Sequence, residues 1–206
     1  MDIYRHDESF RRRGYSVIAG VDEAGRGPLA GPVVAASVIL PDSLRIRGLR
    51  DSKKVPPGER SLLFWEILVS AIAIGVGVVD SDEIDRINIL RATMKAMRLS
   101  LDDLSYTPDA LIVDALTVPG TAVTQFPVIK ADAKSAAVAA ASIVAKYARD
   151  MLMLHYDAAY PQYNFRRHKG YGTREHMDLI ALHGPCPIHR KSFHQVMTPG
   201  LPFPLS

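Results

Sequence analysis

The stretch from residue 15 to residue 40 constrains the fold most strongly. It contains two runs of small and β-branched apolar residues, 15–23 and 33–40, separated by a bend rich in glycine and proline at 25–32. Runs of this kind predict buried strands. We therefore expect the chain to begin its sheet with two strands in hairpin order.

Strand-like and helix-like segments alternate after this hairpin. The run 71–79 is typical of a strand, and its Gly75 and Gly77 would allow a close neighbour on one face. Asp80, with Glu83 three residues later, has the pattern of a capping box at the start of a helix. The other predicted elements are helices at about 58–70 and 134–155 and strands at 110–115 and 123–132.

Two of the predicted helices carry apolar residues that we expect to face the core. After Asp80 we predict a single helix with its apolar residues along one stripe. The helix near 58–70 carries a second group of apolar contacts. Pro127 interrupts the run 123–132 and places that strand near a sheet edge, while Ser135 is a candidate helix cap. The stripe consists of Ile84, Ile87, Leu90, Met94 and Met97, and the second group of Leu62, Leu63, Trp65 and Leu68.

These elements predict an α/β fold with a mixed sheet flanked by helices. The chain has 206 residues, 48% of them hydrophobic and 23% charged, which suits one globular unit with a sizeable core. We assign residues 1–155 to a catalytic core. Residues 156–206 are expected to form a mainly helical C-terminal region that contributes to substrate binding. The tail "PGLPFPLS" shows no pattern of a partner-binding peptide.

Acidic residues follow three of the predicted strands. Asp22 and Glu23 end the first strand, Asp114 ends 110–115 and Asp132 ends 123–132. In open α/β sheets, sites form in the crevice where strand ends meet. Four clustered carboxylates would repel one another unless cations lie between them. Oxygen ligands suit Mg²⁺ or Mn²⁺, and a pair of such ions can drive phosphoryl displacement.

A nucleotide-cofactor site is a weaker interpretation of the same glycines. Gly25, Gly27 and Gly31 follow a strand, as in a dinucleotide-binding loop. However, such a loop must open a helix. Here Pro28 and Pro32 intervene, and the next segment is strand-like.

The neighbouring acids Asp22 and Glu23 raise a geometric problem. A regular strand would point them to opposite faces. For both to reach the same metal ions, we expect the chain to distort at this point, or one residue to contribute its backbone carbonyl. The glycines that follow would leave room for a substrate backbone.

Charge is distributed unevenly along the chain, although its formal net value is only +3. Basic residues concentrate in 45–60 and 166–194, which would suit a polyanion bound over metal ions, although solvated surface would show the same pattern. Cys186 is the only cysteine, so no intrachain disulfide can form. No signal peptide is recognisable, and no apolar run approaches the ~20 residues of a membrane span. We expect a cytoplasmic protein.

Seven blocks in order carry a resemblance to a known family. They resemble the motifs of the type 2 ribonucleases H, the ribonuclease HII family, over roughly residues 17–195. The blocks are "GVDEAGRGPLAGPVVAA", "DSKK", "IVDA", "IKAD", "AAASIVAKYARD", "HKGYGT" and "HRKSF".

This resemblance implies a ribonuclease H-like fold and a metal-dependent endonuclease. The family cuts the RNA strand of RNA/DNA hybrids and cuts 5′ of a ribonucleotide embedded in duplex DNA, leaving 3′-hydroxyl and 5′-phosphate ends. It implies two divalent ions, Mn²⁺ or Mg²⁺, and a role in ribonucleotide excision repair. The preferred metal, any sliding-clamp partner and the balance of the two activities stay open; we expect a monomer.

The family's functional residues map onto matching positions of this chain. Its four metal-binding acids fall on Asp22, Glu23, Asp114 and Asp132, with Asp150 as an alternative to Asp132. Its element that senses the 2′-hydroxyl matches Gly25, Arg26 and Gly27, and its sugar-contacting tyrosine matches Tyr171. Lys53 and Lys54 would contact phosphate or steady the acids, although a solvated loop would show the same residues. Two rival hypotheses are a non-catalytic nucleic-acid-binding protein and another two-metal phosphotransferase that cuts DNA.

Overall fold

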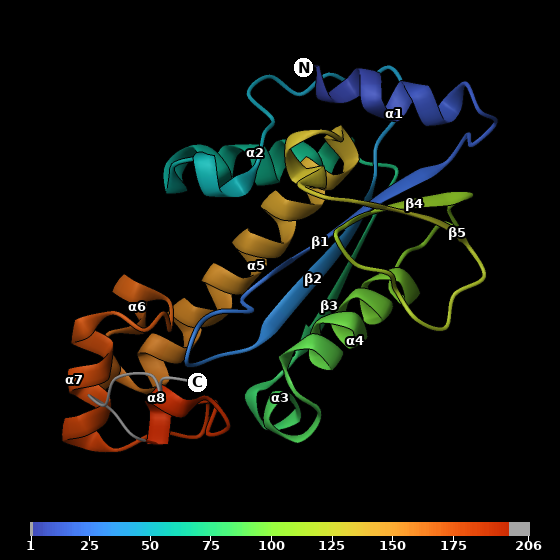
Figure 1. Cartoon of the computed structure of the whole chain (residues 1–206). Coiled ribbons are helices and arrows are strands. Elements are labelled where there is room, and N and C mark those ends of the chain that lie inside the picture. Colours follow the sequence, from blue (N-terminus) through green and yellow to red (C-terminus); the bar gives the residue numbers. More distant parts are fainter. Residues whose placement is uncertain (1, 198–206) are drawn as a thin grey trace.

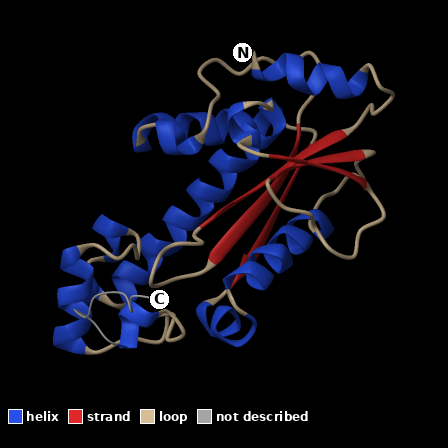
Figure 2. Ribbon diagram, viewed as in Figure 1, coloured by secondary structure: helices blue, strands red, loops and turns tan. Residues whose placement is uncertain are grey.

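A computed structural model describes residues 2–197 of the chain. Its centre is one five-stranded sheet with the strand order β3-β2-β1-β4-β5 (Figures 1 and 2). The strands are β1 (Ile18–Ala24), β2 (Val33–Ile39), β3 (Ala73–Val79), β4 (Ala110–Asp114) and β5 (Thr124–Val128).

The sheet is mixed, as predicted. β1 pairs with β2, and β2 with β3, in antiparallel fashion, whereas β4 lies parallel to β1 and β5 parallel to β4. The predicted hairpin and the edge position of the strand with Pro127 are confirmed. Because β1, β4 and β5 run in the same direction, their carboxyl-terminal ends lie at the same end of the sheet.

Helices cover both faces of the sheet (Figure 2). Helix α5 and α2 pack against one face, and α3 and α4 against the other. Three short 3₁₀ turns connect some of these elements: η1 (Ser52–Lys54), η2 (Ala131–Ala133) and η3 (Pro161–Tyr163). The helices are α1 (Ile3–Arg11), α2 (Pro57–Ser70), α3 (Ser81–Ile87), α4 (Ile89–Asp102), α5 (Ala136–Ala159), α6 (Phe165–His168), α7 (Arg174–His183) and α8 (His194–Met197).

Small residues let α5 approach the sheet closely. Its first turns are rich in buried alanine, and Gly20 of β1 lies directly beneath them. A Cβ at Gly20 would lie 2.1 Å from the carbonyl carbon of Ala137. On the other face, a Cβ at Gly75 or Gly77 would lie about as close to a carbonyl oxygen of α4, which confirms the predicted close neighbour.

The single helix predicted after Asp80 is wrong, because the chain forms two. Asp80 caps α3 as expected, with its carboxylate accepting a hydrogen bond from the Glu83 amide. At Asn88 the backbone turns to φ +69°, which ends α3, and the Asn88 side chain then caps α4. The break leaves Leu90 exposed rather than on a common buried stripe.

Two further expectations about helices need correction. In α2 only Leu63 of the four predicted contacts is buried; Leu62, Trp65 and Leu68 face outward. The N-terminal segment, for which no element is predicted, forms α1. That helix is anchored by buried Asp7, whose carboxylate accepts a hydrogen bond from the Ala137 amide of α5. Ser135 caps α5 as predicted.

The C-terminal helices α6, α7 and α8 gather at the far end of α5, away from α1 and α2 (Figure 1). Helix α5 itself passes residue 155 without a break. The division of the chain into units 1–155 and 156–206 therefore stays a prediction, and the tail that follows Met197 lies outside the described residues.

Candidate active site

The four predicted acids come from three segments at the carboxyl edge of the sheet. Asp22 and Glu23 lie in the last part of β1, Asp114 ends β4, and Asp132 lies in η2 (Ala131–Ala133). Their charges act on one another: Asp114 raises the pKa of Asp22, of Glu23 and of Asp132. The four carboxyl groups are therefore near enough to influence one another's charge.

The expected distortion at Asp22 and Glu23 is absent. The antiparallel pairing of β1 with β2 runs without interruption to Ala24, so both acids lie in regular strand. Pairing of β1 with β4, however, stops at Val21. The acids thus occupy a part of β1 that pairs with β2 alone, and they do so without a bulge.

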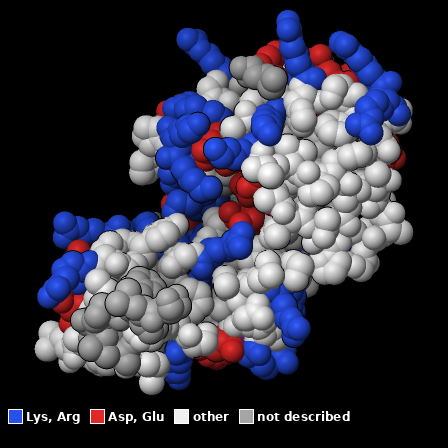
Figure 3. All heavy atoms as spheres, in the orientation of Figure 1, with Lys and Arg blue, Asp and Glu red and all other residues white. Residues whose placement is uncertain are grey.

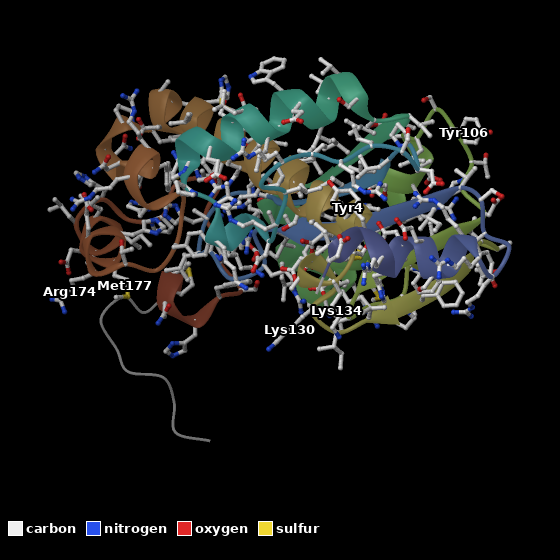
Figure 4. All side chains as sticks on the ribbon, turned by 90° about the horizontal axis from the view of Figure 1, so that it is seen from above. Tyr4, Tyr106, Lys130, Lys134, Arg174 and Met177 are labelled. Carbon is white, nitrogen blue, oxygen red and sulfur yellow. The ribbon has the colours of Figure 1, made fainter. Side chains whose placement is uncertain are left out.

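The prediction that Asp132 ends a strand is wrong, because Asp132 lies beyond the end of β5. Strand β5 stops at Val128, and Lys130 adopts the left-handed conformation with φ +57°. This turn brings the chain back to β4, where the Ala131 amide donates a 2.8 Å hydrogen bond to Asp114 Oδ1. Lys130 and Lys134, on either side of η2, lie at the same edge of the molecule (Figure 4).

Burial makes the charges at Asp22 and Glu23 costly. Asp22 is only 4% exposed, and burial, together with the neighbouring Glu23 and Asp114, raises its pKa well above the ordinary value. Burial also raises the pKa of Glu23, although Arg26 opposes the shift. Arg26 donates a 3.2 Å hydrogen bond to Glu23 Oε1. The protein alone therefore leaves these carboxylates short of positive charge.

Lys53 supplies part of the missing charge. Its Nζ lies 4.0 Å from Asp132 Oδ2. Although burial lowers the pKa of Lys53, the four carboxylates around it (Asp22, Asp132, Asp51 and Asp114) outweigh that effect and raise it. Burial, with the nearby Asp51, likewise raises the pKa of Asp132.

The donor set fits hard divalent cations. Glu23 Oε2 is buried and has no hydrogen-bond partner, which is expensive for a carboxylate oxygen unless a cation meets it. All the available ligands are carboxylate oxygens, the type that Mg²⁺ and Mn²⁺ prefer. Within residues 2–197, no three acidic, histidine or cysteine side chains already stand in the geometry of a metal site. Bound ions would therefore have to draw the repelling acids together.

A pocket of about 540 Å³ adjoins Glu23 and brings most of the predicted substrate residues together. In the space-filling view, acidic atoms lie in a hollow at the centre of the face, with Lys and Arg atoms to their left and below them (Figure 3). Lys54 faces a neighbouring pocket beside Asp132. The lining residues of the first pocket are Glu23, Ala24, Gly25, Arg26, Gly27, Ser52, Lys53, Ile89, Lys146 and Tyr171.

Gly25 and Gly27 both line this pocket, but a side chain would be excluded from the two positions for different reasons. Gly25 has φ +102°, and a Cβ there would lie 2.2 Å from Arg149 Nε, so the fold itself requires it. Gly27 has ordinary φ, and a Cβ there would meet nothing within 4 Å. Since the chain leaves that space open, a side chain at Gly27 would obstruct only what enters the pocket.

The alternative acid, Asp150, lies in α5 and is already paired. It accepts hydrogen bonds from Arg60, at 3.1 Å, and from Lys146. Arg60 also donates to the carbonyls of Ser52 and Val55. Asp150 thereby helps to fix the turn η1 (Ser52–Lys54), which carries both predicted lysines.

Several polar residues around the site are not among those predicted from the sequence. Asp51 lies beside Asp132, and Ser142 of α5 contacts Ser52 at 2.8 Å and lowers the pKa of buried Asp22 by hydrogen bonding. Arg149 and Arg190 bind the loop that contains Gly25. All of these residues lie within the motif blocks quoted above, but their partners are remote in sequence.

Comparison with known proteins identifies the family. The family model for ribonuclease HII matches residues 19–196. The chain belongs to the ribonuclease HII family. It is 55% identical over 194 residues to the ribonuclease HII of Geobacter sulfurreducens, covering 94% of this chain and 89% of that protein.

Solved structures agree with the predicted ribonuclease H-like fold. The crystal structure of ribonuclease H2 from Pyrococcus horikoshii OT3 is similar with a TM-score of 0.73 and 28% identity, over 88% of this chain and 95% of that one. A Bst-RNase HIII solved in complex with Mn²⁺ has a TM-score of 0.66 at 18% identity, over 88% of this chain and 68% of that one, a likeness of fold.

Membership makes this chain a nuclease, a hydrolase of the ribonuclease H class. Ribonucleases H act on RNA/DNA substrates and depend on divalent metal ions. Within the described residues, no helix is both long and apolar enough to cross a bilayer.

Proposed function

We propose that this chain is an endoribonuclease that cuts the RNA strand of RNA/DNA hybrids and cuts 5′ of single ribonucleotides in duplex DNA. It leaves 3′-hydroxyl and 5′-phosphate ends and takes part in ribonucleotide excision repair in the cytoplasm. The observation that carries this proposal is the cluster of four carboxylates, with the unpaired Glu23 Oε2, beside a pocket lined by Gly25, Gly27 and Tyr171.

Asp22, Glu23, Asp114 and Asp132 would hold two divalent ions, Mg²⁺ or Mn²⁺. When bound, these ions would supply activation of the attacking water and neutralise charge at the scissile phosphate. Asp132 is favoured over Asp150 as the fourth acid, because Asp132 interacts with Asp114 and Lys53 whereas Asp150 pairs with Arg60 and Lys146.

The rest of the pocket would recognise the substrate. Backbone groups of Gly25, Arg26 and Gly27 would contact the 2′-hydroxyl, the only group that distinguishes RNA from DNA at one position. The ring of Tyr171, 43% exposed, would test the neighbouring sugar. Lys53 and Lys54, both exposed, would contact phosphates. One chain carries all of these groups, so a monomer would suffice.

One cleavage experiment tests the proposal. Three duplexes are incubated with Mg²⁺, Mn²⁺ or EDTA: DNA with a single ribonucleotide, an RNA/DNA hybrid, and all-DNA. Cleavage of the first two, with loss of all cleavage in EDTA, is expected. No cleavage under any metal would favour a non-catalytic binder, and cleavage of all-DNA would favour another phosphotransferase.

Two variants connect the activity to the site. Asp22→Asn keeps the shape of the side chain but removes its charge, so it should abolish cleavage and leave hybrid binding largely intact. Asp102→Asn is the matched control, because Asp102 pairs with Arg98 on the surface of α4. Turnover retained by Asp22→Asn in Mg²⁺ would refute the site.

A further inference from the structure

Two arginines are buried with no acidic partner beneath the substrate pocket. Arg149 of α5 and Arg190 are both 0% exposed. Within residues 2–197 neither forms an ion pair; instead, their guanidinium groups donate seven hydrogen bonds, all to backbone carbonyl oxygens. A buried charge is normally paired with an opposite charge, so this arrangement needs an explanation.

The acceptors of these hydrogen bonds show what the arginines hold. Arg190 donates to the carbonyls of Gly25 at 2.6 Å, Arg26 at 3.0 Å, Pro28 at 2.7 Å and Gly31 at 3.0 Å. Six of the seven acceptors thus lie in the loop 25–32. Arg149 donates to two of them, the carbonyls of Ala30 at 3.1 Å and Pro32 at 3.0 Å. Pro32 is the last residue of the loop.

The seventh bond joins that loop to the one that carries Tyr171. Arg149 donates to the carbonyl of Lys169 at 3.1 Å, and its guanidinium lies 5.8 Å from the centre of the Tyr171 ring. The Leu29 amide also donates to the Gly170 carbonyl at 2.8 Å. Arg149 therefore contacts both substrate-reading elements, while Arg190 holds the loop 25–32.

This arrangement is costly for stability. Burial, followed by the like charge of Arg149, lowers the pKa of Arg190 to about 9. Apolar side chains of similar volume often replace buried charges without loss of stability. What an apolar side chain cannot do is bind several carbonyls in fixed directions, which the planar fork of arginine does. The geometry is thus suited to holding position.

We propose that Arg149 and Arg190 are positioning residues that fix the loop 25–32 against Tyr171 and thereby set the preference for single ribonucleotides. This rests on the proposed function of that loop and of Tyr171. A single ribonucleotide offers one productive register, in which the loop must meet the 2′-hydroxyl while the ring meets the next sugar. A long hybrid offers many registers and tolerates a looser spacing.

Arg190→Lys and Arg149→Lys test the proposal by keeping the charge and removing the fork. The kcat/KM is measured on a duplex with one ribonucleotide and on a uniform RNA/DNA hybrid, in the same metal. A misplacement of 1 Å can cost about 100-fold, so we expect a loss of that order at the single ribonucleotide and less than about tenfold on the hybrid. Equal losses on both substrates, or none, would overturn the proposal.

Ile180→Ala is the matched control for general destabilisation. Ile180 is buried in α7 and packs with Leu29, but it donates no hydrogen bond from its side chain. This variant should lower the melting temperature without changing the ratio of the two kcat/KM values. A changed ratio in Ile180→Ala would show that any loosening of the region suffices, and would refute a specific role for the arginines.

Amide hydrogen exchange without substrate gives a readout independent of activity. Exchange at 25–32 and 169–172 should be faster in both Lys variants than in the parent protein and in Ile180→Ala. Unchanged protection would overturn the positioning role. If the parent protein fails to cut at single ribonucleotides, the proposed function fails, while the exchange data still decide whether the arginines hold the two loops.

Discussion

Replacing Gly20 by alanine should damage the fold just behind the active site. Gly20 lies in β1, two residues before Asp22, and faces the first turn of α5. An alanine Cβ would lie 2.1 Å from the carbonyl carbon of Ala137 and 2.2 Å from the amide nitrogen of Val138. Because both are backbone atoms of a regular helix, no side-chain rotation can relieve the overlap.

The size of the effect follows from the displacement required. Carbon atoms pack at about 3.5 Å, so α5 and β1 would have to separate by roughly 1.4 Å. Overpacking of a core costs about 1–3 kcal/mol, and a clash between two backbones belongs near the upper value. For a chain of this length, 1 kcal/mol shifts Tm by about 2–4 °C, so Gly20→Ala should lower Tm by roughly 6–12 °C.

Gly58→Ala is the matched control, and it should change stability in the opposite direction. Gly58 lies in α2, and a Cβ there would meet nothing within 4 Å. Alanine in a helix is favoured over glycine by up to about 1 kcal/mol, so Tm should rise slightly. Thermal unfolding by circular dichroism in EDTA measures both variants. A Tm of Gly20→Ala within about 2 °C of the parent protein would refute the close approach.

Three further predictions concern the site. Burial raises the pKa of Asp22, so ionisation of its carboxyl group destabilises the metal-free fold increasingly as pH rises from about 4 through the raised pKa. Asp22→Asn should therefore raise the free energy of unfolding in EDTA, measured by urea titration, by an amount that grows with pH over this range. Mg²⁺ should stabilise the parent protein more than the variant. Gly27→Ala should lower kcat/KM at an unchanged Tm, whereas Gly25→Ala should lower both; a lower Tm for Gly27→Ala would contradict the open space. Asp132→Asn should lose cleavage by at least about 100-fold, whereas Asp150→Asn should lower Tm by a few degrees and keep most activity; the reverse pattern would make Asp150 the fourth acid.

Much of the fold was predictable because local patterns and the tertiary structure agree. The hairpin of β1 and β2, the edge position of β5 and the cap at Asp80 all follow from short-range chemistry. The break at Asn88 was not predictable in the same way, since the apolar spacing continues through it. An asparagine tolerates positive φ and can also cap a helix, but only the packing of α4 decides that it does both.

The regular strand geometry of β1 at Asp22 and Glu23 could not be predicted from the sequence either. The expectation of a distortion rested on the alternation of side chains along a regular strand, which would point Asp22 and Glu23 to opposite faces. The structure shows that β1 outruns β4 by several residues, so the acids sit where one neighbour is missing. Strand lengths of different elements relative to one another depend on the whole sheet, and a pattern within one segment does not record them.

The glycines of the loop and the buried arginines explain why a motif is easier to recognise than to interpret. Gly25 and Gly27 are indistinguishable as letters, yet the first is required by Arg149 and by its own positive φ, and the second by nothing within the described chain. Arg190 likewise has carbonyl groups as partners, which every residue offers, so no complementary residue in the sequence reveals it. An ion pair requires an acidic and a basic residue, and both can be recognised in a sequence. An arginine bound by backbone carbonyls requires no particular residue type as its partner. For that reason, the parts of a site built on backbone contacts emerge only when the chain is folded.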